Sequence, residues 1–140
     1  MSKKINTVLL IDDDKATNFI HELIIKDNDY CDKIVTKYDG EQAIEFLESA
    51  NENDIPDIVF LDINMPKVDG WEFLEKYKEL PKGKRAQIIV VMLTTSLNAN
   101  DKERALSNKF ISEFRNKPLT KEMLTDIEEK YFKKKGVVLN

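Results

Sequence analysis

"IVFLDINMPKVDG", residues 58–70, is an apolar run that stops on an acid and continues into Asn, Met and Pro. Its four leading apolar residues are typical of a strand that is covered on both faces. The aspartate that ends the strand, Asp62, is either a turn residue or a reagent, and its immediate neighbours leave both readings open. The residues at the ends of the other predicted strands are needed to distinguish these two roles of Asp62.

Five short apolar runs, including this one, are predicted to be strands, at residues 5–11, 33–36, 57–61, 87–93 and 110–114. Between them, apolar residues recur at helical spacing. Strand and helix therefore alternate five times, which predicts a parallel sheet with right-handed crossovers. We expect one α/β domain over residues 1–140, a doubly wound five-stranded parallel sheet with five helices. Its core spans about residues 5–133, and a short basic tail follows over 134–140.

Each predicted helix has an apolar face. We expect Asp14 and Asp39 to cap the first two helices, and Asp69 with Gly70 to begin the third. His21 lies at the edge of the first apolar stripe, far from the strand ends, so a surface or boundary position is expected. The predicted apolar faces consist of Ala16, Ile20, Leu23 and Ile24; Ala43, Ile44 and Leu47; Trp71, Phe73, Leu74 and Tyr77; Ala105 and Leu106; and Leu119, Met123, Leu124, Ile127 and Tyr131.

The composition limits the class of protein. With one cysteine, Cys31, and one histidine, His21, the chain can form neither an intrachain disulfide nor a zinc site of Cys and His ligands. The formal net charge of −4 argues against nucleic acid as the main partner, because phosphate binding needs a basic surface. No apolar run approaches the length that spans a bilayer, and the first residues do not resemble a signal peptide. We expect a cytoplasmic protein that binds neither nucleic acid nor membrane.

In an open parallel sheet, the functional crevice lies beyond the carboxyl ends of the strands. Acids follow the first and third predicted strands, hydroxyl groups follow the fourth, and a cation follows the fifth. The sequence therefore predicts that these groups meet at one edge of the sheet. The residues delivered there are Asp12, Asp13, Asp14, Asp62, Thr94, Thr95, Ser96, Lys117 and Pro118.

Each kind of side chain has a chemical reason to lie at this edge. Oxygen ligands favour a hard cation, and Mg²⁺ is commonly held by one or two carboxylates, water and a phosphate oxygen. Beside Asp62, such an ion keeps the carboxylate ionised and offsets the charge of an incoming phosphoryl group. Lys117 can pair with a carboxylate before reaction and with a phosphoryl oxygen after it, and Thr94 can donate a hydrogen bond to the same group. The edge is suited to moving a phosphoryl group onto an aspartate.

Four motifs in order, each at a strand end, resemble the receiver domain of the two-component response regulator family: "LLIDDD", "FLDINMPKVDG", "VVMLTTS" and "NKPLT". The match runs from about residue 5 to 133. The resemblance implies a CheY-like, flavodoxin-like fold with strand order 2-1-3-4-5. It also implies a phosphoprotein of phosphorelay signal transduction, here a stand-alone single-domain response regulator with no effector domain after the receiver.

The resemblance assigns roles to individual residues. Asp62 matches the phosphoacceptor, and Asp12 and Asp13 match the acid pair that binds Mg²⁺ or Mn²⁺ together with Asp62. Asn64 matches the position whose backbone carbonyl completes the metal shell. The remaining matches are Thr94 to the switch hydroxyl, Lys117 to the phosphate-binding lysine, Pro118 to the proline after it, often joined by a cis bond, and Phe114 to the rotating aromatic.

By the same resemblance, the chain is a signalling phosphoacceptor and not an enzyme, although it assists its own phosphotransfer and autodephosphorylation. A sensor histidine kinase or a histidine phosphotransfer protein would supply the phosphoryl group. An unidentified downstream protein would bind the face formed by the fourth helix, the fifth strand and the fifth helix. Thr95 departs from the family, which usually has Ala or Gly there, and its branched side chain narrows the route to Asp62.

Two other functions remain open. A receiver-like docking module that is never phosphorylated would keep the fold without the chemistry; the full set of acceptor residues argues against it, and Thr95 leaves it open. A phosphohydrolase with an aspartyl-phosphate intermediate, of the haloacid-dehalogenase type, would need a second acid two residues after the nucleophile, where this chain has Asn64. A P-loop nucleotide enzyme is excluded because the 4 glycines are scattered and form no phosphate loop.

Overall fold

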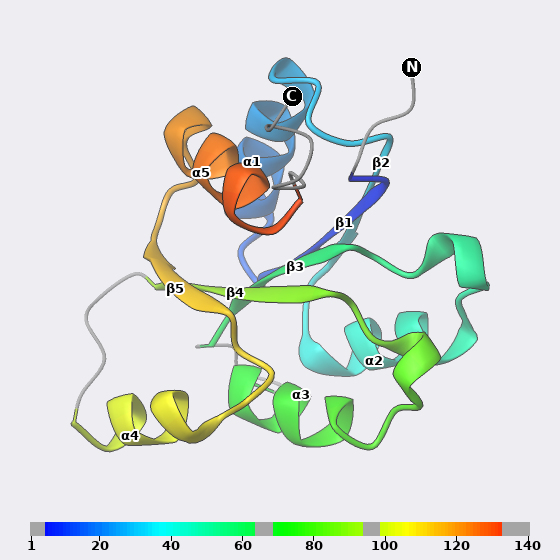
Figure 1. Ribbon diagram of the computed structural model, residues 1–140, viewed down its shortest axis with the longest axis vertical. Coiled ribbons are helices and arrows are strands. Elements are labelled where there is room, and N and C mark those ends of the chain that lie inside the picture. Colours follow the sequence, from blue (N-terminus) through cyan, green and yellow to red (C-terminus); the bar gives the residue numbers. More distant parts are fainter. Residues whose placement is uncertain (1–4, 64–68, 94–98, 133–140) are drawn as a thin grey trace, which may run out of the picture.

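The computed structural model describes residues 5–63, 69–93 and 99–132. Within these ranges, five parallel strands form one sheet in the order β2-β1-β3-β4-β5, which confirms the order that the resemblance implied (Figure 1). The strands are β1 (Thr7–Ile11), β2 (Lys33–Lys37), β3 (Ile58–Asp62), β4 (Ile88–Leu93) and β5 (Glu113–Asn116). The helices are α1 (Lys15–Asp27), α2 (Gly40–Ser49), α3 (Gly70–Tyr77), α4 (Ala99–Ser107) and α5 (Lys121–Tyr131), with short 3-10 helices η1 (Glu52–Asp54) and η2 (Lys82–Lys84).

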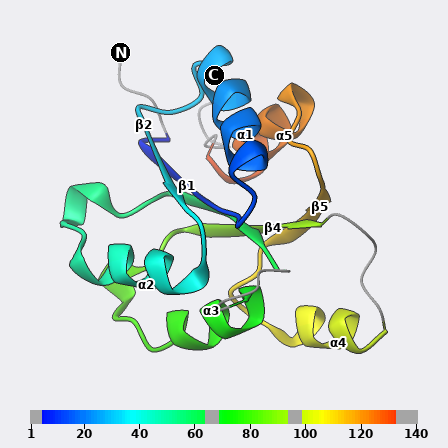
Figure 2. The same ribbon diagram turned by 180° about the vertical axis from the view of Figure 1, so that it is seen from behind.

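Helices cover both faces of the sheet. Helices α1 and α5 lie side by side on one face, and α2, α3 and α4 lie on the other (Figures 1 and 2). The strand residues alternate between two hydrophobic clusters, because successive side chains of a strand point to opposite faces. In β1, Leu9 and Ile11 join the cluster of α2, α3 and α4, whereas Val8 and Leu10 join the cluster of α1 and α5. Every residue of β1 and β3 is buried, as their continuous apolar runs predicted.

The fifth strand begins later than the sequence predicted. The apolar residues at 110–114 indicated a strand there, but β5 spans Glu113–Asn116. Phe110 and Ile111 pack half-buried against the cluster of α2, α3 and α4 before the strand begins. These two residues are therefore apolar because they pack as part of a loop. The pairing of β5 with β4 starts only at Glu113. Of the five residues predicted to form this strand, only Glu113 and Phe114 lie in β5.

The helix starts and two of the apolar faces follow the prediction. Side chains of Asp14, Asp39 and Asp69 each accept a hydrogen bond from a backbone N–H in the first turn of their helix. The predicted faces of α2 and α3 are buried. Of the residues expected to be inside near α4 and α5, Ala105, Leu119, Leu124 and Ile127 are buried, Met123 is half-buried and Tyr131 is exposed, while the Leu106 side chain lies outside the description.

In α1 the predicted apolar face is wrong except at Ile24, which is half-buried and packs against the cluster of α1 and α5. Ile20 and Leu23 are 48% and 43% exposed, and Ala16 is exposed as well. The buried residues of this helix are Asn18, His21 and Ile25. Two polar side chains have therefore taken the place that the apolar stripe was expected to fill. Within the described ranges, none of the helices has the length and apolar content needed to cross a membrane.

The first turn of α3 is pressed against the end of β3. The backbone N–H of Gly70 donates to the carbonyl oxygen of Ile63 at 2.9 Å. A Cβ atom on Gly70 would lie 2.5 Å from Ile63 Cα and 2.9 Å from the carbonyl oxygen of Asp62. Both are backbone atoms, which cannot swing aside as the end of a side chain can. Glycine at this position therefore permits the close approach of α3 to the strand that carries Asp62.

Gly70→Ala is expected to lower the free energy of unfolding by about 1–3 kcal/mol, because the backbone has to shift to admit the methyl group. Gly83→Ala is the matched control, since a Cβ there meets nothing within 4 Å. This variant is expected to leave the free energy of unfolding unchanged or to raise it by about 0.4–1 kcal/mol, because alanine lowers the conformational entropy of the unfolded chain. Urea denaturation compares the two variants. Equal stability would mean that α3 moves away from β3 without cost.

Candidate functional site

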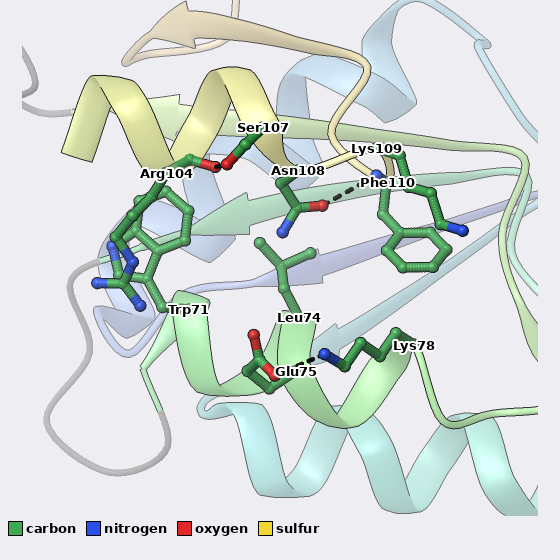
Figure 3. Close-up of a pocket in the computed structure, with 9 residues that line it drawn as sticks. All are labelled: Trp71, Leu74, Glu75, Lys78, Arg104, Ser107, Asn108, Lys109 and Phe110. Atoms are coloured by element: carbon green, nitrogen blue, oxygen red, sulfur yellow. Dashed lines mark hydrogen bonds and ion pairs between the residues drawn. The ribbon is translucent and has the colours of Figure 1, made fainter. Parts of the chain in front are cut away.

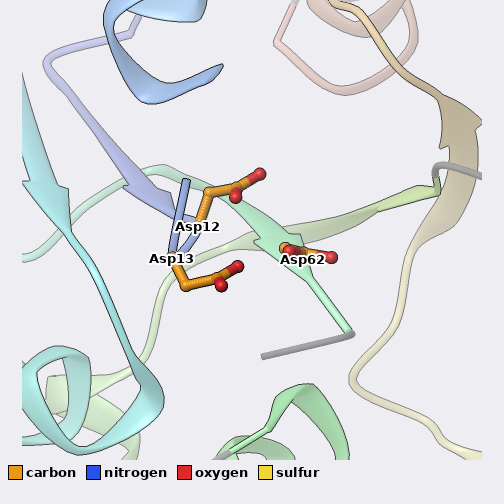
Figure 4. Close-up of side chains that lie close together, drawn as sticks. All are labelled: Asp12, Asp13 and Asp62. Carbon is orange, nitrogen blue, oxygen red and sulfur yellow. The ribbon is translucent and has the colours of Figure 1, made fainter. Parts of the chain in front are cut away.

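Three carboxylates gather at the carboxyl ends of β1 and β3 (Figure 4). Asp12, Asp13 and Asp62 each offer an oxygen atom, and these atoms all lie within 4.8 Å of one another. Asp12 and Asp62 are only 4% and 5% exposed, whereas Asp13 is open to solvent. The sheet produces this arrangement, because β1 and β3 pair with Ile11 opposite Leu61. The next residue of each strand is then an acid, and the two acids lie next to each other.

Lys117, which follows β5, reaches the two buried acids. Its Nζ atom lies 2.6 Å from Asp12 Oδ2 and 3.5 Å from Asp62 Oδ2. Burial alone lowers the pKa of Lys117, but the hydrogen bond from its ammonium to Asp12 and the charges of Asp12 and Asp62 outweigh burial and raise that pKa. The side chain therefore remains an ammonium and joins carboxylates that come from two different strands.

The chemistry of this group suits a hard divalent cation. The three acids carry three formal negative charges, and Lys117 compensates one of them. Two negative charges remain, and every available ligand atom is a carboxylate oxygen, the ligand type that Mg²⁺ and Ca²⁺ prefer. Asp14 is engaged differently: its side chain accepts hydrogen bonds from the Thr17 hydroxyl and the Ala16 N–H at the start of α1. It caps the helix, as the sequence predicted.

The other predicted site residues are placed in part. Pro118 is exposed and follows Lys117 through a cis peptide bond, as the resemblance suggested. Phe114 lies on β5 opposite Val91 and packs half-buried against the cluster of α2, α3 and α4. Asn64, Thr94 and Thr95 lie outside the described residues, so their proposed roles stay predictions.

Two buried polar residues of α1 were missed or misplaced by sequence reasoning. The Asn18 side-chain Nδ2 donates to the carbonyl oxygens of Asp12 at 3.0 Å and Lys37 at 3.3 Å. His21 is 3% exposed, and its Nε2 accepts a hydrogen bond from the Leu119 N–H at 3.3 Å. The expected surface or boundary position of His21 is therefore wrong. These contacts attach α1 to the ends of β1 and β2 and to the start of α5.

The environment of His21 keeps its ring in the accepting state. Burial lowers the pKa of His21, and the nearby Lys117 charge lowers it further, while the Asp12 charge acts in the opposite direction. The ring is therefore neutral at neutral pH, and Nε2 has a lone pair for the Leu119 N–H. A usable signal was present in the sequence, because Asn18, His21 and Ile25 recur at spacings of three and four and share one face.

His21→Leu is expected to lower the free energy of unfolding by about 1–3 kcal/mol, because the buried Leu119 N–H loses its acceptor while the volume of the side chain is nearly kept. His21→Gln supplies an amide oxygen of similar reach and is expected to recover most of this loss. Urea denaturation at neutral pH measures both variants. If the leucine variant is as stable as the wild type, the Leu119 N–H does not depend on His21.

The chain matches the family model described as the response regulator receiver domain over residues 8–128. The response regulator Rcp1 of Synechocystis sp. is 36% identical over 97 residues, which cover 67% of this chain and 65% of Rcp1. Hybrid signal transduction histidine kinase B of Dictyostelium discoideum is 26% identical over 140 residues, which cover 93% of this chain but 7% of the kinase. The chain thus spans slightly under two thirds of one relative and a small part of the other.

Solved structures agree with this match. A two-component response regulator from Cytophaga hutchinsonii has a TM-score of 0.78 and 31% identity, with 91% of this chain and 97% of that chain covered. The receiver domain of a Pseudomonas aeruginosa sensor histidine kinase, solved with magnesium in its active site cleft, shares the fold at a TM-score of 0.74 and 20% identity, covering 91% and 97%. The chain therefore belongs to the response regulator receiver family, the phosphoacceptor domains of two-component signalling, which bind Mg²⁺ at an acidic pocket and interact with histidine kinases or phosphotransfer proteins.

Proposed function

We propose that this chain is a response regulator that accepts a phosphoryl group on Asp62 from a phosphorylated histidine of a partner protein. One observation carries the proposal: Lys117 contacts both Asp12 and Asp62 at the point where three carboxylates converge. A structural ion pair needs one acid and one base. A third acid, Asp13, is open to solvent beside the pair and would supply a further ligand for a cation next to Asp62.

The transfer follows from these positions. A carboxylate oxygen of Asp62 forms a bond to phosphorus while the bond from phosphorus to the histidine nitrogen breaks, and the electron pair of that bond stays on the nitrogen. The incoming phosphoryl group brings additional negative charge into a place with little solvent. Lys117 already lies 3.5 Å from Asp62 and can turn its ammonium from a carboxylate oxygen to a phosphoryl oxygen. The contacts with Asp12 and Asp62 raise the pKa of Lys117, so it is an ammonium before the transfer begins.

Asp12, Asp13, Asp62 and the backbone carbonyl of Asn64 would hold Mg²⁺ or Mn²⁺ in this proposal. The fit rests on the oxygen donors and on the two formal negative charges that Lys117 leaves uncompensated. When bound, the ion would offset the charge that the phosphoryl group brings to Asp62. Lys117 and Asp12 hold the acceptor side chain in place beside it.

The outward face of α1 offers a surface for the phosphodonor. Phe19, Ile20 and Leu23 are adjacent on this helix, and Phe19 is 62% exposed. They lie one to two turns after the acid pair that ends β1. Contiguous exposed apolar side chains mark a surface that contacts another protein. A histidine kinase or histidine phosphotransfer protein that packs on this face would lie close to Asp62.

The output side of the proposal involves Thr94, Phe114 and the surface of α4, β5 and α5. Phosphorylation would draw Thr94 toward the acceptor and change the packing of Phe114, which would alter the surface of α4, β5 and α5 for a downstream protein. This is a shift between two populated conformations, driven by a charge that one of them accommodates better. We also propose that the protein assists the removal of its own phosphoryl group. We expect it to act in the cytoplasm.

Wild-type protein incubated with Mg²⁺ and a small phosphodonor is expected to gain the mass of one phosphoryl group, and Asp62→Asn is expected to gain none. Intact-mass spectrometry measures the gain, and the added group should be stable in acid and labile in base, as an acyl phosphate is. Asp14→Asn is the control, because Asp14 follows β1 directly after Asp12 and Asp13 but caps α1. It should be phosphorylated like the wild type.

The same assay separates the rival functions. A wild-type protein that gains no phosphoryl group would be a docking module of receiver fold and not a phosphoacceptor. Continuous release of inorganic phosphate with many turnovers would indicate a phosphohydrolase. A phosphoryl group that still appears on Asp62→Asn would place the acceptor elsewhere and refute the assignment of Asp62.

Asp13→Asn is expected to weaken Mg²⁺ binding at least about tenfold, because it removes a carboxylate ligand, and even outer-shell partners of metal sites contribute that much. Asp14→Asn removes the same charge one residue later and is expected to leave Mg²⁺ affinity nearly unchanged, since asparagine also caps helices well. Isothermal titration calorimetry compares the two. Equal weakening would mean that general charge at this strand end, and not ligation by Asp13, attracts the ion.

A further inference from the structure

A cavity separate from the acid cluster opens between α3, α4 and the loop that leads to β5 (Figure 3). Asp12, Asp13 and Asp62 do not line it. Its volume is about 330 Å³, enough for a few side chains of a partner. Trp71 and Leu74 of α3 and Phe110 of the loop supply its apolar lining. Trp71 and Leu74 are buried members of the core, so this lining is held rigidly.

The remaining wall of this α3–α4 cavity is cationic. Arg104 lies over the ring of Trp71, with its guanidinium carbon 4.4 Å from the ring centre, and the Lys109 ammonium lies 5.5 Å from the ring centre of Phe110. Both cations are held by aromatic rings that are themselves fixed. Lys78 also lines the cavity and pairs at 3.0 Å with Glu75, the one acidic residue among the described residues that line it. The lining therefore has a net positive charge.

Asn108 adds a hydrogen-bond donor to this wall. Its Oδ1 accepts a hydrogen bond from the Phe110 N–H at 2.9 Å, and the other side of its amide faces into the cavity (Figure 3). The Nδ2 group can therefore donate to an acceptor on a ligand. A carboxylate beside an apolar side chain would satisfy the donor, the cations and the apolar lining together.

We propose that the α3–α4 cavity binds an acidic segment of a partner protein, with a carboxylate between Arg104 and Lys109 and an apolar side chain against Trp71 and Leu74. The net positive charge of this lining contrasts with the formal net charge of −4 of the whole chain. Tryptophan and arginine are also the residues most enriched among those that dominate binding energy at protein interfaces.

The surface next to the cavity indicates a short acidic peptide segment and not nucleic acid. On the other side of α3, the groove between α2 and α3 is lined by five glutamates and one lysine: Glu41, Glu45, Glu48, Glu75, Glu79 and Lys76. A long polyanion that reached past α3 would meet this acidic wall and be repelled. A segment with few carboxylates, confined to the cavity, avoids that repulsion.

The test uses Trp71, the only tryptophan of the chain, whose fluorescence reports on the cavity directly. Unmodified full-length protein is titrated with a synthetic peptide of Glu and Leu, with a Lys and Leu peptide of the same length, and with a single-stranded oligonucleotide. We expect a saturable change with the Glu peptide that weakens as salt is added, and none with the Lys peptide. No phosphorylation is involved, so the result is independent of the function proposed for Asp62.

Two charge-matched variants of α4 locate the binding. Arg104→Gln is expected to weaken binding of the Glu peptide about tenfold, because it removes the cation held over Trp71. Lys102→Gln removes the same charge from the same helix at an exposed position that does not line the cavity, and should change affinity less than about twofold. Both residues are exposed, and circular dichroism verifies that both variants are folded.

Several results would overturn the proposal. If Arg104→Gln and Lys102→Gln weaken binding of the Glu peptide equally, general charge attraction explains the binding. The same conclusion follows if the oligonucleotide binds as tightly as the Glu peptide. No fluorescence change with the Glu peptide would leave the cavity without the assigned ligand. If the fluorescence of Trp71 changes with protein concentration in the absence of peptide, and sedimentation velocity detects dimers, the cavity binds a second copy of this chain instead.

Discussion

Asp12 and Asp62 end neighbouring strands with almost no solvent contact, and the ammonium of Lys117 is what allows the two carboxylates to lie together. Like charges at such depth repel more strongly than in water. Loss of one partner from a buried ion group typically costs about 3–5 kcal/mol, because charge is left uncompensated. Asp12 and Lys117 are 105 residues apart in sequence. The contact therefore ties the junction of β5 and α5 to the first strand and fixes the edge at which the chemistry takes place.

The same edge determines how α1 is oriented. Asn18 and His21 hydrogen-bond to backbone groups at the ends of β1 and β2 and at the start of α5, so they have to face the sheet. A helix has only one face toward the sheet, and the apolar Phe19, Ile20 and Leu23 are consequently turned outward. Satisfying buried backbone groups has outweighed the burial of these apolar side chains. The exposed apolar surface near the acceptor is thus a consequence of how the site is built.

Sequence reasoning succeeded where a pattern reports burial directly. The continuous apolar runs of β1, β3 and β4 and the helical spacing in α2 and α3 predicted elements and faces that the structure contains. It failed in α1, because apolar periodicity identifies a face without saying whether the sheet or another molecule covers it. That Asp12 and Asp62 lie together could be predicted because both follow paired residues at the ends of parallel strands. The position of Lys117 near them was expected because it follows the fifth predicted strand and matches a lysine of the family. Nothing in the pattern of α4 indicated that Arg104 lies on Trp71.

Helix α3 connects the two surfaces to which we assign function. Its first residue, Gly70, lies so close to Ile63 and the carbonyl of Asp62 that a Cβ atom would not fit between them. The next residue, Trp71, lines the cationic cavity and is covered by Arg104. Trp71 is therefore joined through the backbone to the residue that packs directly on the end of β3. Coupling between two sites is a free energy that acts equally in both directions. A ligand that packs on Trp71 and a charge added at Asp62 would both act next to Gly70, so each is expected to alter the affinity for the other.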